Sequence, residues 1–262
     1  ERVEERRVDW CHQAVWVPKP NGGVRCTTDF TNLNPQVKRI VHYTKTPSDA
    51  VNEIVPDAKY FTVCDAKSGY WQMELEEASR DLTCFNTPWG MFRYMVGPMG
   101  LVDTGDNYGI RTDKAIEGLP RTTKVVDDSI IGSRTYTEHV EDVRSFMQRC
   151  KDNGITLNKD KFVFAADKVK FAGYIVSREG READPSKVKA IREFPSPTTI
   201  TELRGFLGLV NQLGSFSKDI SEAAEPLREL LRKKNEFVWI KNHEEAFEKV
   251  KELLTKTPIL AT

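Results

Sequence analysis

Two adjacent aspartates, Asp127 and Asp128, interrupt an apolar run in the segment KVVDDSII, residues 124–131. Adjacent aspartates are common in turns, where Asp tolerates the backbone conformation and forms local hydrogen bonds. Here the apolar flanks predict a turn at the tip of a buried hairpin, where neighbouring carboxylates repel each other unless a cation neutralises them. Mg²⁺ suits such a site, because it takes oxygen ligands and keeps several waters for substrate phosphates.

A third carboxylate, Asp65, ends the apolar segment YFTVCD, residues 60–65. Two strands of one sheet can bring this acid to the Asp127–Asp128 pair. Three carboxylates with two Mg²⁺ ions about 3.5–4 Å apart form a two-metal arrangement for phosphoryl transfer. One ion then activates a 3′-hydroxyl, and the other holds a triphosphate and its leaving pyrophosphate.

The elements that position these acids are predicted from periodicity and turn residues. We expect strands at 60–65 and, with alternating polarity, at 70–76. We expect two strands around a turn at 20–23, a hairpin over 83–96, a helix at 106–117, and two short strands meeting at the aspartate pair. A helix at 137–153, with Gly154 after its end, and strands within 161–176 complete a mixed α/β region.

Helical signals dominate from about residue 182 onward. Asp184-Pro185 combines an N-cap with proline at the first helical position, and 199–202 has capping-box spacing. Four apolar residues near the end of the chain share one helical face: Phe247, Val250, Leu253 and Leu254. The chain therefore reads as an α/β part followed by a helical part.

Composition bounds the class of protein. The chain has 262 residues, enough for one large domain or two modest ones, and equal totals of 39 basic and 39 acidic residues. Binding of nucleic acid would therefore depend on local placement of basic side chains. Five scattered cysteines without a CxxC pair indicate reduced thiols in an intracellular setting. No apolar run approaches the ~20 residues that span a bilayer, and the charged N-terminus reads as an excised edge.

The order of motifs along the chain resembles the reverse transcriptases of gypsy-type LTR retrotransposons and their retroviral relatives. The matching segments, from the N-terminus, are VWVPKPNGGVRCTTDFTNLN, FTVCDAKSGYWQMELEEASRDLTCFNTPWGMFRYMVGPMGL, VVDD, GITLNKDKFVF, VKFAGYIVSREGREADPSKVKAI and PSPTTITELRGFLGLVNQLGSF with EPLRELLRKKNEFVW. Each segment is moderately specific, whereas all of them in the family's order are very specific. The resemblance implies a right-hand polymerase fold with fingers, palm and a helical thumb.

For the reacting centre, the resemblance implies that Asp65, Asp127 and Asp128 bind two Mg²⁺ ions, with Mn²⁺ as an alternative. The backbone carbonyl of Ala66 is an expected additional ligand. Lys161 is a candidate proton donor to pyrophosphate, although an exposed lysine at the end of an element is nearly as plausible. The family's box usually begins with Tyr where this chain has Val125, a change that removes no metal ligand.

For the nucleotide, the resemblance places Arg25 on the incoming triphosphate, which suits a bidentate guanidinium. Lys19 is a weaker candidate for the same task, and a solvated loop lysine explains it equally well. Tyr70 falls at the position of a steric gate that excludes a 2′-hydroxyl, the alternative being simple packing. Met99 falls where the family has the floor of the nucleotide pocket.

For the nucleic acid, the resemblance implies a primer grip of Phe171, Gly173 and Tyr174. A basic run in the thumb would track duplex phosphates or form an ordinary polar helix face, two readings that stay open. Its members are Arg228, Arg232, Lys233 and Lys234.

The expected organisation is fingers and palm over 1–178, followed by the thumb and the start of the connection over 179–262. The fingers lie mainly in 1–50 and 75–98, and the palm mainly in 51–74 and 99–178. The expected function is RNA- and DNA-directed DNA polymerisation, with a primed RNA or DNA template and dNTPs as partners and no membrane.

The alternative is a catalytically weak or domesticated relative that binds nucleic acid; its sequence, however, would rarely spare all three carboxylates. An RNA-directed RNA polymerase or a two-metal nuclease fits the motifs poorly. Because the chain stops at PILAT, we expect polymerisation without ribonuclease H activity. The expected location is a cytoplasmic virus-like particle or the nucleus, and the sequence leaves the oligomeric state open.

Overall fold

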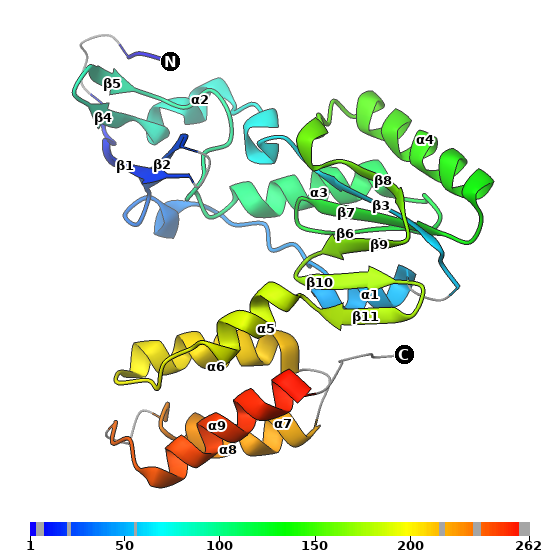
Figure 1. The fold of residues 1–262 in the computed structure, drawn as a ribbon. Coiled ribbons are helices and arrows are strands. Elements are labelled where there is room, and N and C mark those ends of the chain that lie inside the picture. The colour runs from blue at the N-terminus through cyan, green and yellow to red at the C-terminus, as the bar shows by residue number, and fades with distance from the viewer. Residues whose placement is uncertain (4–7, 20–21, 55–56, 215–217, 233–236, 257–262) are drawn as a thin grey trace. The chain divides into compact units, whose positions relative to one another are not determined.

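The structure is a computed structural model that describes residues 1–3, 8–19, 22–54, 57–214, 218–232 and 237–256. The chain forms two compact units (Figure 1). The first consists of Glu1–Pro56 with Tyr60–Ala166, and the second of Asp57–Lys59 with Asp167–Thr262. Mixed α/β structure in the first unit and helices in the second confirm the predicted fold class.

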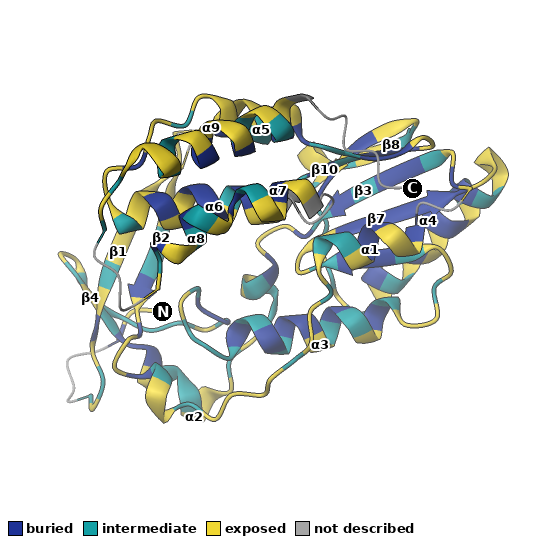
Figure 2. Cartoon of the chain, turned by 90° about the horizontal axis from the view of Figure 1, so that it is seen from below, coloured by how far each residue is buried: buried dark blue, intermediate teal, exposed yellow. Residues whose placement is uncertain are grey.

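A four-stranded antiparallel sheet forms the centre of the first unit. Its strand order is β6 (Thr122–Val125), β7 (Asp128–Ser133), β3 (Tyr60–Asp65) and β8 (Val163–Ala166). Figure 2 shows β3 and β7 mostly buried, as expected for apolar runs in the middle of a sheet. The predicted strand at 60–65 and the two strands meeting at the aspartate pair are confirmed.

Helices α3 (Thr104–Ile116) and α4 (Tyr136–Asp152) confirm two further predictions. Helix α4 begins with a capping box of Thr135 and Glu138. Its apolar stripe packs on the sheet in one cluster, whose buried members are Cys64, Ile131, Val143, Phe146 and Cys150. Met147, on the same helix, is 49% exposed and lies outside this cluster. On the sheet, α1 (Pro47–Ile54) contacts β6 and β7.

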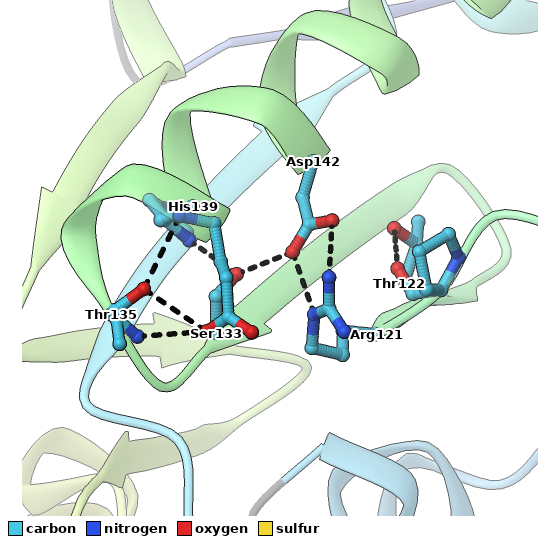
Figure 3. Close-up of polar contacts among 8 residues, drawn as sticks. Arg121, Thr122, Ser133, Thr135, His139 and Asp142 are labelled. Carbon is cyan, nitrogen blue, oxygen red and sulfur yellow. Dashed lines mark hydrogen bonds and ion pairs between the residues drawn. The ribbon is translucent and has the colours of Figure 1, made fainter.

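A chain of buried polar groups links α4 to the ends of β3 and β7 that lie away from the aspartates (Figure 3). The hydroxyl of Thr62 lies 2.7 Å from Nε2 of His139, and Nδ1 of His139 lies 2.9 Å from Oγ of Ser133. Ser133 donates to Asp142 at 2.7 Å, and the Arg121 guanidinium donates to both oxygens of Asp142 at 2.7 Å. Because Ser133 gives its proton to Asp142, His139 must be protonated on Nδ1 and accept at Nε2.

Burial lowers the pKa of His139 below its ordinary value, so the ring is neutral at pH 7. Burial alone would raise the pKa of Asp142, but the hydrogen bonds from Arg121 and Ser133 outweigh it and hold that pKa low. Ser133 and His139 have no exposed surface. The Ser–His–Asp order therefore serves packing and hydrogen bonding, since no substrate can reach the hydroxyl.

A second four-stranded sheet has the order β2 (Val24–Asp29), β1 (His12–Pro18), β4 (Phe85–Thr87) and β5 (Gly90–Phe92). Strands β1 and β2 are antiparallel, β4 pairs with β1 in parallel, and β5 closes an antiparallel hairpin with β4. Both predicted hairpins are confirmed, although the predicted turn residues Pro20 and Asn21 lie outside the described residues.

The predicted strand at 70–76 is wrong. The 3₁₀ helix η2 (Gly69–Gln72) occupies its first half, after Ser68 with a left-handed φ of 53°. Of the second half, only Glu74 forms an isolated bridge, to Val96, before α2 (Glu77–Arg80) begins. The alternation of apolar and polar residues does not follow burial here. Trp71 is 45% exposed, whereas the Gln72 side chain binds backbone groups.

The second unit contains a three-stranded antiparallel sheet and a helical core. Its strands are β9 (Lys168–Phe171), β10 (Tyr174–Ser177) and β11 (Gly180–Ala183). The helices are α5 (Pro185–Arg192), α6 (Ile200–Gly214), α7 (Lys218–Ala223), α8 (Glu225–Glu229) and α9 (Lys241–Lys256). Asp184 caps α5 as predicted, accepting from the backbone of Ser186, and the shared face of α9 joins the core. Within the described part of the chain, no helix is both long and apolar enough to cross a membrane.

Candidate active site

The aspartate pair lies in a tight turn between β6 and β7. Val125 pairs with Asp128, which leaves Val126 and Asp127 as a two-residue loop. Val126 has a φ of 56°, and Asp127 does not have a positive φ. This pattern, with positive φ at the first loop position alone, is that of a type II′ hairpin turn. A β-branched residue in this region costs about 1–3 kcal/mol, and such strain is typical of functional sites.

Strand pairing brings the third aspartate to this turn. Asp65 is the register partner of Asp128 on adjacent strands, so both side chains project from the same face of the sheet. Cys64 packs against α4, and side chains alternate along a strand, so Asp65 and Asp128 point away from that helix. The backbone N–H of Ala66 donates to the carbonyl of Asp127 at 3.3 Å. The three predicted acids therefore meet at one edge of the sheet.

The charges at this edge are unbalanced. Partial loss of water, followed by the charges of Asp65 and Asp127, raises the pKa of Asp128, and Lys161 opposes this rise. Because Asp128 is exposed, water still reaches it, and repulsion from Asp65 and Asp127 is the main cause of the raised pKa. Lys161, on η4 (Lys159–Lys161), donates from Nζ to Oδ2 of Asp65 at 2.6 Å.

The donor set suits a hard divalent cation, since every side-chain donor is a carboxylate oxygen. A bound cation would also relieve the repulsion that raises the pKa of Asp128. Among the described residues, no three side chains of His, Cys, Asp or Glu converge tightly enough to hold a metal ion. Binding would therefore require the three carboxylates to turn toward a shared ion, with Lys161 released from Asp65.

Tyr70 lies beside the turn, on η2. Burial, followed by the charges of Asp127 and Asp106, raises the pKa of Tyr70. Its ring meets the buried ring of Tyr108 edge to face, with centroids 5.5 Å apart. Gly69 is required at this contact, because a Cβ there would lie 2.6 Å from the Tyr108 ring. Tyr108 was not among the predicted site residues, although its place in the predicted helix 106–117 could have indicated it.

The other predicted nucleotide-binding residues lie on the second sheet and a neighbouring loop. Arg25, on β2, is exposed, and its side chain has no hydrogen bond or ion pair within the described residues. Lys19 is exposed in the turn after β1. Met99 is half-buried beside Gly100, which has a φ of 99° and leaves no room for a side chain against the Thr28 carbonyl. These assignments stay predictions.

The predicted primer grip forms a tight hairpin in the second unit. Phe171 and Tyr174 pair with each other on β9 and β10, and both are buried. Ala172 and Gly173 form the loop, with φ values of 46° and 91°. A nucleic-acid strand could therefore reach the partly exposed Ala172–Gly173 loop but not the rings of Phe171 and Tyr174.

The predicted basic run is only partly described. Arg228 donates to the backbone of Ser221 at 2.9 Å and lies 3.6 Å from Glu225. Arg232 is 65% exposed and lies 3.5 Å from Glu225. Lys233 and Lys234 lie outside the described residues. The acidic neighbours on α8 favour a polar helix face for Arg228, whereas Arg232 remains accessible to a phosphate.

Comparison with known proteins decides the family. Residues 17–176 match the family model described as "Reverse transcriptase (RNA-dependent DNA polymerase)". This chain belongs to the reverse transcriptase family. The matched range includes the whole sheet of β6, β7, β3 and β8, helices α3 and α4, and all three aspartates.

Retrotransposon polyproteins are among the relatives of this reverse transcriptase chain. The Tf2-3 and Tf2-7 transposon polyproteins of Schizosaccharomyces pombe (strain 972 / ATCC 24843) are each 29% identical over 98% of the chain. The chain spans 19% of the length of these relatives. They confirm the resemblance to gypsy-type elements.

Solved structures of similar fold include foamy viral protease-reverse transcriptases. One, in complex with double-stranded DNA, has a TM-score of 0.86 at 22% identity, over 95% of this chain and 44% of that one. Another, in complex with an RNA/DNA hybrid, has a TM-score of 0.83 at 21% identity, over 97% of this chain and 34% of that one. At these identities the likeness establishes the polymerase fold.

Proposed function

We propose that this chain is an RNA- and DNA-directed DNA polymerase domain that adds dNTPs to a primer 3′-hydroxyl. The observation that carries the proposal is the meeting of Asp65, Asp127 and Asp128 at one sheet edge in a chain of the reverse transcriptase family. Two Mg²⁺ ions bound there, or Mn²⁺ in their place, would activate the hydroxyl and neutralise the phosphates.

The side chains of the site divide the work around the reacting atoms. Asp65, Asp127 and Asp128 would hold the metal, with the Ala66 carbonyl as a further oxygen ligand. Lys161 lies against Asp65, and a cation bound by Asp65 would release it, so that its ammonium could donate a proton to the departing pyrophosphate.

The incoming nucleotide would be bound from several directions. Arg25, which has no partner within the described residues, would bind the triphosphate, with Lys19 as a second cation. Tyr70, held against Tyr108, would close the space beneath C2′ of the sugar and exclude a hydroxyl there. Met99 would form the floor of the pocket.

The nucleic-acid partner would be a primed RNA or DNA template. Structures of similar fold were solved with double-stranded DNA and with an RNA/DNA hybrid, which supports this choice. Phe171 and Tyr174 would hold the Gly173 loop against the primer, because glycine permits close approach of a sugar-phosphate backbone. The thumb residues proposed to contact phosphates are Arg232, Lys233 and Lys234, while Arg228, which binds the Ser221 backbone and lies near Glu225, would belong to the polar helix face.

We place this activity inside the cell, in a cytoplasmic virus-like particle or the nucleus. All five cysteines are free thiols, and three of them, Cys64, Cys84 and Cys150, are buried. A reducing compartment suits such a set.

Primer extension tests the proposal. The purified chain, with Mg²⁺ or Mn²⁺ and dNTPs, should extend a DNA primer on an RNA template and on a DNA template. Asp127→Asn should abolish extension, whereas the exposed carboxylate change Asp152→Asn should not. Binding of primed template without extension by the parent chain would instead support the domesticated binding module.

Sugar selection tests the gate separately. Tyr70→Ala should admit ribonucleotides, because nothing else proposed here closes the space beneath C2′. The measurement is the ratio of kcat/KM for a dNTP to that for the matching rNTP. An unchanged ratio in an active variant would remove Tyr70 from this role.

A further inference from the structure

We infer that Gln72 and Arg111 are positioning residues that set sugar discrimination, by fixing the Asp65–Tyr70 loop against the segment that follows α4. The inference rests on the proposed polymerase function. Neither residue is assigned to the site by its motif, and neither needs to touch the substrate. Both act on the backbone that carries the gate and the metal ligands.

The Gln72 side-chain amide makes three hydrogen bonds to backbone groups on two separate segments. Its Nε2 donates to the carbonyls of Lys67 at 2.7 Å and Thr156 at 2.9 Å. Its Oε1 accepts from the N–H of Thr156 at 2.8 Å. A side chain at this position must donate to two carbonyls and accept from one N–H. An amide can do both, whereas a carboxylate has no donor for the carbonyls.

The Arg111 guanidinium holds the same junction from α3. It donates to the backbone carbonyl of Gln72 at 2.6 Å and to that of Asn153 at 2.8 Å. A second contact of the same nitrogen reaches the carbonyl of Gly154 at 3.4 Å. The planar fork of Arg thus bridges η2 and the end of α4 in one fixed geometry, which a lysine cannot reproduce.

The clamped segments carry the groups that select and hold the nucleotide. Between Lys67 and Gln72, the chain turns through η2 and presents the ring of Tyr70. On the other side, Asn158 donates to the carbonyl of Asp65 at 2.7 Å, and Ala66 bridges to Leu157. The clamp therefore fixes the height of the Tyr70 ring relative to the metal-binding edge, which is the distance that decides whether a 2′-hydroxyl fits.

The test compares Gln72→Ala and Gln72→Glu with Gln148→Ala. Gln148 is a suitable control because, among the residues that the structure describes, its amide bonds only the exposed Asp152 side chain, at 2.7 Å. Each variant is assayed in primer extension for KM and kcat with a dNTP and with its matching rNTP, and for thermal unfolding. Arg111→Lys and Arg111→Ala are assayed in the same way, with Tyr70→Ala as the reference for lost discrimination.

We expect the ratio of kcat/KM for the dNTP to kcat/KM for the rNTP to decrease by about 10- to 100-fold in both Gln72 variants. The fall should come mainly from a lower KM for the rNTP, and Gln148→Ala should match the parent. Arg111→Lys should recover only part of the discrimination that Arg111→Ala loses.

Equal losses for both sugars, or an unchanged ratio, would overturn the inference, since a merely structural role lowers both activities together. An inactive parent chain would instead refute the proposed polymerase function. In that case the clamp would be tested on folding alone, where an unchanged melting temperature in Gln72→Ala would also overturn it.

Discussion

Carboxylates in opposite electrostatic states lie at the two ends of β7, Asp142 of α4 beside Ser133 and Asp128 beside the turn. At one end, Asp142 accepts hydrogen bonds from Arg121 and Ser133, and its pKa is lowered. At the other end, Asp128 faces Asp65 and Asp127, and its pKa is raised. We call the Asp142 end the balanced end, because hydrogen-bond donors offset the charge of its carboxylate. We call the Asp128 end the unbalanced end, because neighbouring carboxylates repel each other there.

The backbone shows the same contrast. The unbalanced end turns through Val126 in a left-handed conformation, and its charges have one cation, Lys161, within hydrogen-bonding distance of Asp65. At the balanced end, every polar atom of His139 has a partner. The buried network stabilises the sheet, whereas the exposed acids are held in an arrangement that a bound cation would complete.

Replacing the unbalanced acid should have the largest effect on activity. Asp128→Asn removes a metal ligand, so primer extension should fall by roughly a thousandfold or more. Stability should stay unchanged or rise, because the substitution relieves repulsion. If Asp128→Asn extended the primer at the parent rate at saturating dNTP, Asp128 would not be a metal ligand.

An Asp→Asn change at the balanced end should instead lower stability and leave activity unchanged. Asp142→Asn removes the charge that receives both Arg121 bonds, which should lower the free energy of unfolding by about 1–3 kcal/mol. The urea midpoint measures this loss. Activity per folded molecule should stay near that of the parent, and a selective loss of activity without destabilisation would contradict the structural role.

Added Mg²⁺ should sharpen the contrast by stabilising only one end. At ten times its dissociation constant, a ligand that binds only the folded state contributes about 1.4 kcal/mol. The melting temperature of the parent should therefore rise with Mg²⁺, and that of Asp127→Asn should rise less. An equal rise in both would show that the ion binds elsewhere.

Mild acid should produce the smallest effect, through His139. Its pKa is lowered by burial, with Asp142 opposing, so the unfolded state binds the proton more readily. The stability from the neutral ring is complete above the ordinary His pKa and is lost as pH falls below it. Between pH 6.5 and 5.5 the loss should be about 1 kcal/mol at most. His139→Gln should flatten this slope, and a parent slope identical to that of the variant would remove His139 as its source.

Local signals in the sequence predicted much of the fold. Alternation, turn residues and caps placed β3, the hairpin at Val126–Asp127, α4 and the helix after Asp184. Such signals depend on neighbouring residues, and the chain satisfies them wherever the element lies. The same reasoning failed at 70–76, because a 3₁₀ helix forms over Gly69–Gln72 and the Gln72 side chain binds backbone groups of Lys67 and Thr156.

The sequence by itself determined which acids are present and where most strands and helices lie, because propensity, periodicity and capping are properties of short segments. Only the tertiary structure decided that Asp65 pairs in register with Asp128, that Tyr70 rests on Tyr108, and that Gln72 reaches Thr156. These contacts join residues far apart in the chain. Their geometry comes from strand register and helix packing, which no local pattern encodes.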